Sequence, residues 1–462
     1  MEIKKEIILA YALKNAVEHN GKAIVGSVIS SLFNHGLTKD KVKNIMPFVN
    51  EILKEVNSMP FEKQKKEFEK LESIVGHRPE REGLQELPNA IPEKVVLRLA
   101  PYPSGALHIG NAKTYLLNAL YAEKYKGKLL LIIDDTIGSE EKQIVKSAYK
   151  LIPEAFDWLK VKYEKPIIYK SDRLEIYYKY AEELIKKEKA YVCYCSQEKL
   201  RENRAGGIEC EHRGQTAEQA LKEWKKMFSL RQGEAVLRIK TSMQNKNPAF
   251  RDRVLFRISE REHPRVGKKY KLWPMLEFSW AIDDYLLGIT HIVRGKDLMI
   301  ESEMEKFIWD IFKWKHPVLV HAGMVKIEGM GAKISKSKAQ KEVASGEFSG
   351  WDDPRTWSVQ SLRKRGFQPE VIRKFIEDIG LNQNDISVPI EILYSINRKI
   401  VHDIAIKADF KENKKGKFTI IMENGSEKKF NSNAKPKQGE IFHFLKFGYA
   451  RFEKGKFYFA HP

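Results

Sequence analysis

Residues 95–113, VVLRLAPYPSGALHIGNAK, decide the fold class of this chain. The apolar run VVLRLA is typical of a buried strand, PYPSGA of a turn-rich loop, and the residues from Leu107 onward of a helix that follows directly. Residues 128–135, KLLLIIDD, predict a second strand. A strand, loop, helix and strand in this order begin a parallel α/β sheet, in which ligands bind at the carboxyl ends of the strands. We therefore expect the loop at 101–107 to border a ligand site.

This loop and the helix after it have the chemistry of a phosphate site. Pro103, Ser104 and Gly105 lead into a helix whose first amide groups and dipole can face an anion, with His108 in its first turn. A core histidine at a helix start is the alternative for His108. Residues 331–340, GAKISKSKAQ, favour the phosphate site, because a loop with several ammonium and hydroxyl groups can close over a triphosphate. A solvated, lysine-rich loop is the alternative for that segment.

The composition narrows the class of protein. A chain of 462 residues is expected to form two to four domains. Its 82 Lys and Arg residues against 62 Asp and Glu give a formal net charge of +20, which favours a polyanionic partner. The chain has no run of about eighteen apolar residues, and its start, MEIKKEII, lacks the layout of a signal peptide. We expect a soluble, cytoplasmic protein without membrane association.

The cysteines form a second constellation, because all three lie close together in the sequence. YVCYC supplies Cys193 and Cys195, and IECEH supplies Cys210 and His212. Two pairs of ligands, each with one residue between its members, can surround a tetrahedral Zn²⁺ ion with three sulfurs and one nitrogen. Four protein ligands leave no open position, so such a zinc ion would be structural. Three free thiols without a metal are the alternative.

Changes of pattern along the chain predict its domain organisation. We expect an α/β fold with a parallel, Rossmann-type sheet that a middle region splits in two. The predicted segments are a helical N-terminal appendage (1–75), a linker (76–94), the first half of the Rossmann domain (95–190), an inserted zinc-bearing domain (191–275), the second half of the Rossmann domain (276–345), a helical region (346–400) and a short β-barrel (401–462). Within the second half, AIDDYLLGITHIVRG at 281–295 is expected to resume the strand pattern.

With these motifs the chain resembles the class I aminoacyl-tRNA synthetases: HIGN at 108–111 stands for their HIGH motif and KISKS at 333–337 for KMSKS. More narrowly, it is similar to archaeal-type glutamyl-tRNA synthetases over most of residues 1–400. The similar segments, in the order of that family, are RLAPYPSGALHIG (98–110), RAGGIECEHRGQ (204–215), GEAVLRIKT (233–241), WAIDDYLLGITHIVRGKD (280–297) and GEFSGWDDPRTWSVQSLRKRGFQPE (346–370).

The resemblance implies ATP-dependent ligation of glutamate to tRNA(Glu) through a glutamyl-adenylate, with tRNA(Gln) as a further candidate. It implies ATP, Mg²⁺ and a structural Zn²⁺ as cofactors, and suggests a monomer. It also implies that the inserted domain binds the acceptor end of the tRNA, the helical region its stem, and the shortened β-barrel the anticodon side. No magnesium ligand can be named from the sequence.

The resemblance also assigns site residues. Its ATP-binding residues are Pro103, Ser104, Gly105, His108, Gly110, Asn111, Lys333, Ser335, Lys336 and Ser337. Among them His108, Lys333 and Lys336 are the catalytic group. His108 is expected to donate hydrogen bonds to the ATP phosphates, and Lys336 to stabilise the leaving pyrophosphate. Arg98 and Arg294 match arginines that meet the carboxylates of the substrate, and Asp134 matches the residue that holds its ammonium group.

The chain departs from the family pattern around the amino-acid pocket. It has Ile132 where the family commonly has Arg, Ile137 where it has Asp, Leu276 where it has Tyr, and Asn111 for the second histidine of HIGH. These changes leave two rival interpretations open. One is a synthetase for a related amino acid such as glutamine. The other is a degenerate paralogue that binds tRNA without charging it, although the chain retains His108 and the KISKS lysines.

Overall fold

The computed structural model describes residues 4–35, 37–75, 83–138, 143–329 and 336–462. Contacts divide the chain into two units, Met1–Glu82 and Gly83–Pro462, and each is described by itself. No helix in these described ranges is long and apolar enough to cross a lipid bilayer.

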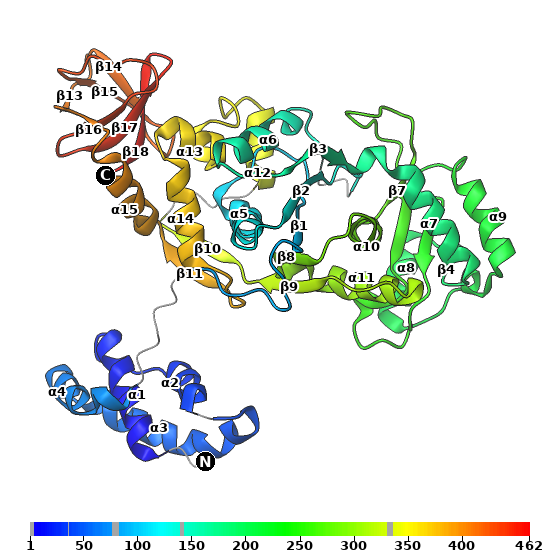
Figure 1. The fold of residues 1–462 in the computed structure, drawn as a ribbon, viewed down its shortest axis with the longest axis horizontal. Helices are drawn as coiled ribbons and strands as arrows, with labels where there is room; N and C mark the ends of the chain where they lie inside the picture. The colour runs from blue at the N-terminus through cyan, green and yellow to red at the C-terminus, as the bar shows by residue number, and fades with distance from the viewer. Residues whose placement is uncertain (1–3, 36, 76–82, 139–142, 330–335) are drawn as a thin grey trace. The chain divides into compact units, whose positions relative to one another are not determined.

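The N-terminal unit is helical, as the apolar spacing of its sequence predicts. Its helices are α1 (Lys5–Glu18), α2 (Val25–Leu32), α3 (Val42–Ser58) and α4 (Phe61–Leu71) (Figure 1). Leu13, Val28 and Val56 from three of these helices are completely buried in one core. A buried amide joins the fourth helix to the rest, because Gln64 Nε2 donates to the carbonyl oxygens of Gly21 (2.9 Å) and Val56 (2.8 Å).

The second unit contains the parallel sheet that the sequence predicts, in two halves. Strands β1 (Val96–Leu99), β2 (Lys128–Ile133) and β3 (Glu164–Tyr169) pair in parallel in that order. Strands β8 (His291–Gly295) and β9 (Val318–Ala322) form the other parallel pair. The Thr290 amide donates to the Val96 carbonyl oxygen (3.0 Å), and the Val96 amide donates to Thr290 Oγ1 (2.8 Å), so β8 lies beside β1. The order across the sheet is therefore β3-β2-β1-β8-β9.

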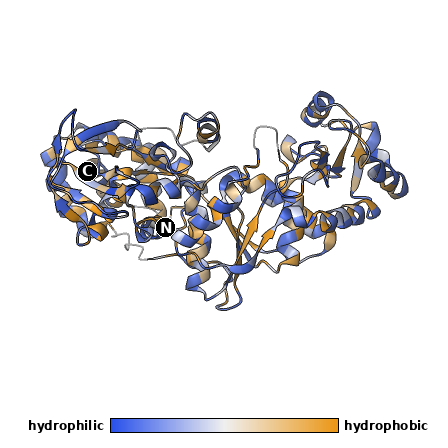
Figure 2. Cartoon of the chain, turned by 90° about the horizontal axis from the view of Figure 1, so that it is seen from above, coloured by the Kyte–Doolittle hydropathy of each residue, from blue (hydrophilic) through white to orange (hydrophobic). Residues whose placement is uncertain are grey.

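Both faces of this sheet are covered by helices, which explains the apolar character of its strands (Figure 2). The covering helices are α5 (Ile109–Lys124), α6 (Ala148–Trp158), α7 (Leu174–Lys186), α10 (Leu276–Leu286) and α11 (Met299–Phe312). Leu129, Leu131 and Ile133 of β2 belong to a core shared with α5 and α6. Leu130 packs instead into a second core, which includes residues of α7, α10 and α11. The alternation of strand side chains thus connects the sheet to two hydrophobic cores.

One sequence-based expectation in this region was wrong. Residues 281–286, AIDDYL, complete helix α10 rather than resume the strand pattern, and β8 begins only at His291. Phe278, Ala281 and Ile282 are completely buried in one core, and their spacing of three and four residues is that of a helix face. A short apolar run fits either structure, and tertiary packing decided for the helix.

The middle region that splits the sheet has a sheet of its own. Strands β4 (Ala190–Cys193), β5 (Val236–Ile239), β6 (Val254–Ile258) and β7 (Leu272–Pro274) pair antiparallel in chain order, accompanied by α8 (Gln197–Gly206) and α9 (Ala217–Met227). Trp224 of α9 packs edge to face on Phe256 of β6, with ring centroids 5.2 Å apart. This antiparallel sheet and its two helices form the inserted module.

The chain after the sheet is mainly helical. Strands β10 (Val325–Glu328) and β11 (Ile386–Pro389) form a parallel pair, and the helices are α12 (Lys336–Ala344), α13 (Val359–Arg365), α14 (Pro369–Ile379) and α15 (Ile390–Val401). Leu362, Ile372 and Leu393 of the last three helices belong to the same core as α5. The helical region is therefore continuous with the sheet domain.

The C-terminal region is a curled β-sheet that does not close. Its strands are β12 (Ile406–Ala408), β13 (Lys411–Glu412), β14 (Phe418–Ile421), β15 (Glu427–Asn431), β16 (Ile441–Phe444), β17 (Gly448–Glu453) and β18 (Lys456–His461). They are ordered β12-β16-β17-β18-β14-β15-β13 around a core rich in phenylalanine. Because β12 and β13 each have one neighbour, the short barrel expected from the sequence takes the form of a half-barrel.

Candidate active site

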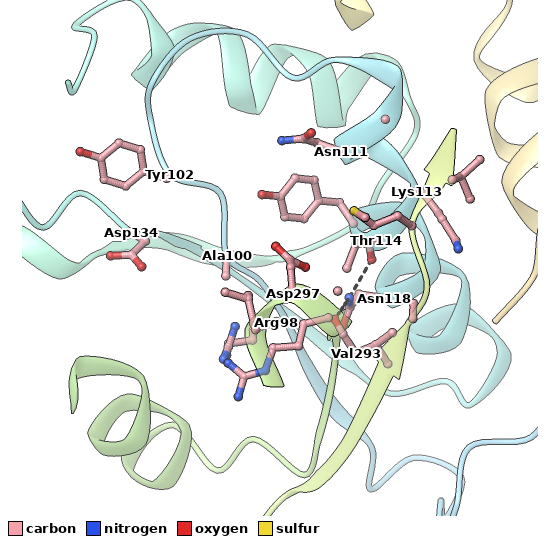
Figure 3. Close-up of a pocket in the computed structure, with 18 of the residues that line it drawn as sticks. Arg98, Ala100, Tyr102, Asn111, Lys113, Thr114, Asn118, Asp134, Val293 and Asp297 are labelled. Atoms are coloured by element: carbon pink, nitrogen blue, oxygen red, sulfur yellow. Dashed lines mark hydrogen bonds between the residues drawn. The ribbon is translucent and has the colours of Figure 1, made fainter. Parts of the chain in front are cut away.

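A cavity of about 410 Å³ opens at the carboxyl ends of β1, β2 and β8, the edge of a parallel sheet where ligands bind. It brings together residues that the sequence analysis named separately: Arg98, His108, Gly110, Asn111, Asp134 and Arg294. In Figure 3, Asp134 and Tyr102 lie at one end of the cavity and Lys113 at the other, with Arg98 between them. The cavity therefore brings the predicted amino-acid residues and the HIGN turn into one space.

His108 occupies the N-cap position of helix α5. Its Nδ1 accepts a hydrogen bond from the Gly110 amide (3.1 Å), which places the proton of a neutral imidazole on Nε2. Backbone bonds hold the turn in place: the Ile109 amide donates to Trp357 (3.2 Å), and the Val359 amide donates to Leu107 (2.8 Å). His108 is only partly buried and lines the cavity, which is the position required of a phosphate ligand rather than of a core histidine.

The loop before His108 is constrained by a tryptophan. Gly105 has a φ of +138°, and a Cβ atom there would lie 2.1 Å from Cη2 of Trp351. Only glycine fits this conformation and this close approach. Pro103 and Ser104 are buried beside it, and none of these three residues is among the described side chains that line the cavity. Their ATP-binding role stays a prediction that rests on the backbone of the turn.

The KISKS segment is placed only in part. Lys333 and Ser335 lie outside the described residues. Lys336 is the first residue of helix α12, which also contains Ser337. The assignment of these four residues to ATP therefore remains a prediction.

Both predicted substrate arginines line the cavity, and each is bound to a buried carboxylate of the protein. Arg98 Nη2 donates to Asp284 Oδ2 (2.9 Å), and its Nε donates to Oδ1. Arg294 Nη1 donates to Glu305 Oε1 (2.9 Å), and its Nη2 contacts Oε2. Burial disfavours the charged guanidinium of Arg294, but the Glu305 carboxylate outweighs burial and raises its pKa. Arg98 Nη1 takes no part in the ion pair with Asp284, and Arg294 Nε takes no part in the ion pair with Glu305.

Asp134 is buried at the end of β2 among three donors. Trp280 Nε1 donates to Oδ2 (2.9 Å) and Thr136 Oγ1 donates to Oδ1 (3.0 Å). Lys170 Nζ lies 3.4 Å from Oδ2, with a completely buried side chain. Trp280 lines the cavity beside Asp134, whereas Lys170 lies behind the wall.

Sequence reasoning missed the partners of these charged groups. Lys170, Trp280 and Glu305 were not singled out, and Asp284 was named only as part of the segment AIDDYLLGITHIVRG. They come from the 3-10 turn after β3, from α10 and from α11, at separations of 11 to 186 residues from the groups that they contact. A charged residue within an apolar segment, such as Asp284 in AIDDYL, is the one signal that could have pointed to them.

The cysteine cluster converges in the inserted module. Cys193 Sγ lies 3.8 Å from Cys210 Sγ, and Cys195 Sγ lies 3.7 Å from His212 Nδ1. All four possible ligand atoms are within 4.8 Å of one another. Bonds of about 2.3 Å to a tetrahedral zinc ion require sulfurs about 3.8 Å apart, so the donor set fits this ion. Burial raises the pKa of the Cys193 thiol to about 12 without a metal, and a bound cation would favour the thiolate instead.

Comparison with known proteins identifies the class that this fold and cavity define. A model of the family "tRNA synthetases class I (E and Q), catalytic domain" matches residues 94–403. The sheet, the insertion and the helical region up to α15 all lie in this range. The fold and the HIGN turn at its cavity are therefore those of a class I tRNA synthetase.

Relatives narrow the class. The glutamate–tRNA ligase of Pyrococcus furiosus is 45% identical over 416 residues, which cover 88% of this chain and 72% of that protein. The glutamate–tRNA ligase of Methanocaldococcus jannaschii is 39% identical over 426 residues, covering 92% and 75%. A crystal structure of a glutamate tRNA ligase from Elizabethkingia meningosepticum in complex with its amino acid aligns with a TM-score of 0.49 at 20% identity, covering 68% of this chain and 70% of that one. The chain belongs to the class I tRNA synthetases for glutamate and glutamine, and within them to the glutamate–tRNA ligases.

Proposed function

We propose that this protein joins glutamate to tRNA in two steps. The glutamate carboxylate attacks the α-phosphorus of ATP, which releases pyrophosphate and forms glutamyl-adenylate. A hydroxyl of the terminal adenosine of the tRNA then attacks the carbonyl carbon, and AMP leaves. The observation that carries the proposal is that the HIGN turn and the charged groups Arg98, Asp134 and Arg294 line one cavity.

The HIGN turn is suited to the phosphate end of this reaction. The positive end of the α5 dipole favours an anion beside it, and His108 carries its proton on Nε2. His108 therefore acts as a hydrogen-bond donor to ATP and not as a base. Lys333 and Lys336 would complete the site by stabilising charge on the pyrophosphate. Members of the class use ATP with Mg²⁺, which would neutralise phosphate charge there.

The opposite end of the cavity suits an amino acid with two carboxylates. We assign the ammonium group to Asp134, whose position between β1 and α10 puts a buried anion at the cavity wall. Arg98 and Arg294 would meet the carboxylates through the N–H groups that Asp284 and Glu305 do not occupy. Leu276 lines the same cavity and offers no hydrogen bond, so we expect weaker glutamate binding than in a pocket with a polar residue there.

The remaining parts are assigned by the same reasoning. We propose that the insertion binds the acceptor end of tRNA(Glu), with one Zn²⁺ ion held by Cys193, Cys195, Cys210 and His212. The helical region at 346–400 would contact the stem and the half-barrel the anticodon side. We further propose that the chain acts as a monomer, and that tRNA(Gln) is the second tRNA to test as an acceptor.

ATP–pyrophosphate exchange in the presence of tRNA tests the proposal. We expect exchange with glutamate and clearly less with glutamine or aspartate, because a neutral or shorter side chain leaves a buried guanidinium poorly matched. Equal or greater exchange with glutamine would overturn the assignment of glutamate. No exchange with any amino acid, together with intact tRNA binding, would support a tRNA-binding paralogue instead.

A further inference from the structure

Lys170 is a buried cation at the amino-acid end of the cavity. It begins a short 3-10 helix, Lys170–Asp172, directly after β3. Tyr169 pairs with Ile133 in the sheet, so Lys170 follows beside Asp134 at the ends of two neighbouring strands. Its Nζ donates to Ser279 Oγ (2.7 Å) and lies 3.4 Å from Asp134 Oδ2. A completely buried ammonium group requires such compensation, because its desolvation costs several kcal/mol.

Lys170 also fixes the aromatic wall of the cavity. Its Nζ lies over the Trp280 ring at 3.5 Å from the centroid, and Arg98 Cζ lies over the same side chain at 3.5 Å. Both cationic groups therefore contact the indole. The indole Nε1 donates to the Asp134 carboxylate (2.9 Å). Lys170 thus contacts both the ring and the carboxylate that face the substrate space.

The charges around Trp280 balance only when Lys170 is counted. Arg98 is paired with Asp284 and Arg173 with Asp283, which leaves Lys170 as the partner of Asp134. The nearby Arg294 is paired with Glu305. Glutamate brings a net charge of about −1 into this region and glutamine brings none at neutral pH. Without Lys170, the same pocket would hold an uncompensated carboxylate, which repels glutamate more than glutamine.

We propose that Lys170 is a specificity-determining residue for the amino acid. It acts through Asp134 and Trp280 without touching the substrate: its positive charge balances Asp134, and the arginine end of the cavity then accepts a second carboxylate in preference to an amide. The proposal rests on the proposed function, because it presumes that glutamate is the substrate.

The variants Lys170→Met and Lys170→Gln test this inference. The ratio of kcat/KM for glutamate to that for glutamine, measured by exchange with tRNA present, should fall about tenfold to a hundredfold in both variants. The change should lie mainly in the KM for glutamate, with the KM for ATP unchanged within about twofold. Lys170→Gln keeps a donor for Asp134 and Ser279, so it decides the question if the Met variant does not fold.

Arg365→Met is the matched control. Arg365 is also completely buried, but it donates to the carbonyl oxygens of Phe459 (2.9 Å) and Ala460 (2.7 Å), away from Asp134 and Trp280. It should lower stability and leave the glutamate-to-glutamine ratio at the wild-type value. A folded Lys170 variant with the wild-type ratio would overturn the inference alone, as would an equal fall in Arg365→Met. A wild-type chain that activates no glutamate would overturn the proposed function, and the inference with it.

Discussion

The tautomer of His108, and with it the role of this side chain, depends on a hydrogen bond from the backbone. It accepts the Gly110 amide as a helix cap, and this bond sets the tautomer that lets Nε2 donate. A residue that only capped α5 could be replaced at a cost of about 1 kcal/mol in stability. A residue that binds phosphate in the transition state is needed for rate, so kinetics separate the two roles.

We predict that His108→Ala and Lys336→Ala each slow adenylate formation by about two to four orders of magnitude, the scale of losing one donor to developing charge. The affinity for tRNA should hardly change, because neither residue lies in the parts assigned to it. ATP–pyrophosphate exchange measures adenylate formation, and a tRNA-binding titration measures the affinity. Exchange at the wild-type rate in either variant would remove that residue from the mechanism.

At the scale of elements, the cysteine cluster is the place where a bound metal would stabilise the inserted module. The four ligands come from the end of β4 and from the segment around the 3-10 helix Glu211–Gly214. Arg238 Nη1 of β5 lies 3.6 Å from Cys210 Sγ and 3.8 Å from Cys193 Sγ, where it can donate to thiolates. A metal here would connect two loops and a strand, in addition to the core that the module shares with α7, α10 and α11.

We predict one zinc ion per chain, bound by this cluster. Its removal by a chelator should increase amide hydrogen exchange in β4 and α8 more than in β1 and α5, because the module loses its crosslink, whereas β1 and α5 pack in a core that contains none of the four ligands. Cys210→Ser should lower the zinc content in the same way. Elemental analysis gives the stoichiometry, and a zinc-free protein that is fully active and indifferent to chelators would contradict the site.

The half-barrel carries a pH-sensitive contact at its last strand. Asn397 Nδ2 of α15 donates to His461 Nε2 (2.9 Å), and His461 Nδ1 donates to the Pro462 carbonyl oxygen (2.9 Å). Burial lowers the pKa of His461 to about 4. The folded state therefore favours neutral histidine, and its stabilising effect is complete above the ordinary pKa of about 6.5.

We predict that stability of the α15–β18 contact falls by up to about 3 kcal/mol as the pH drops from 6.5 to 4, because the folded state must then accept a buried charge. Amide exchange in β18 at several pH values reports this loss. His461→Gln keeps an acceptor for Asn397 without titrating, so its profile should be flatter. Equal slopes for both proteins would show that other groups control the acid sensitivity.

At the scale of the whole molecule, charge is the property that concerns tRNA. The net charge of +20 is reflected in the half-barrel, whose exposed lysines include Lys411, Lys414, Lys415, Lys417, Lys435 and Lys437. Exposed ammonium groups of this kind can contact the phosphates of a tRNA.

We predict that tRNA affinity falls steeply with salt, because several phosphates are neutralised on binding and their counterions are released. Replacing Lys414 and Lys415 by Gln should weaken binding and reduce the slope of log affinity against log salt by about one to two. ATP–pyrophosphate exchange that does not depend on contact between tRNA and the half-barrel should not change. A flat salt response of the wild-type protein would contradict the electrostatic account.

The sequence by itself determined the class of fold and located the HIGN turn. The run of strand, loop, helix and strand at 95–135 is local, and so are the HIGN turn, the cysteine spacing and the shift to short alternating strands after about residue 400. Patterns of this kind follow from the periods of helices and strands and from turn chemistry, which act over a few residues. Arg98, Asp134 and Arg294 came instead from the resemblance to the synthetase family, which assigns them to one site.

Only the tertiary structure decided what each charge of that site contacts. Sequence spacing does not show that Arg98 is bound by Asp284, that Asp134 is balanced by Lys170, or that residues 281–286 are helical. Buried ion pairs form where packing removes water from groups that are far apart in the chain, so each side chain takes the partner that the fold places nearby. The same packing presses Trp351 against Gly105 and bonds Trp357 to the HIGN turn. The local patterns thus name the groups of the site, and long-range packing assigns their partners.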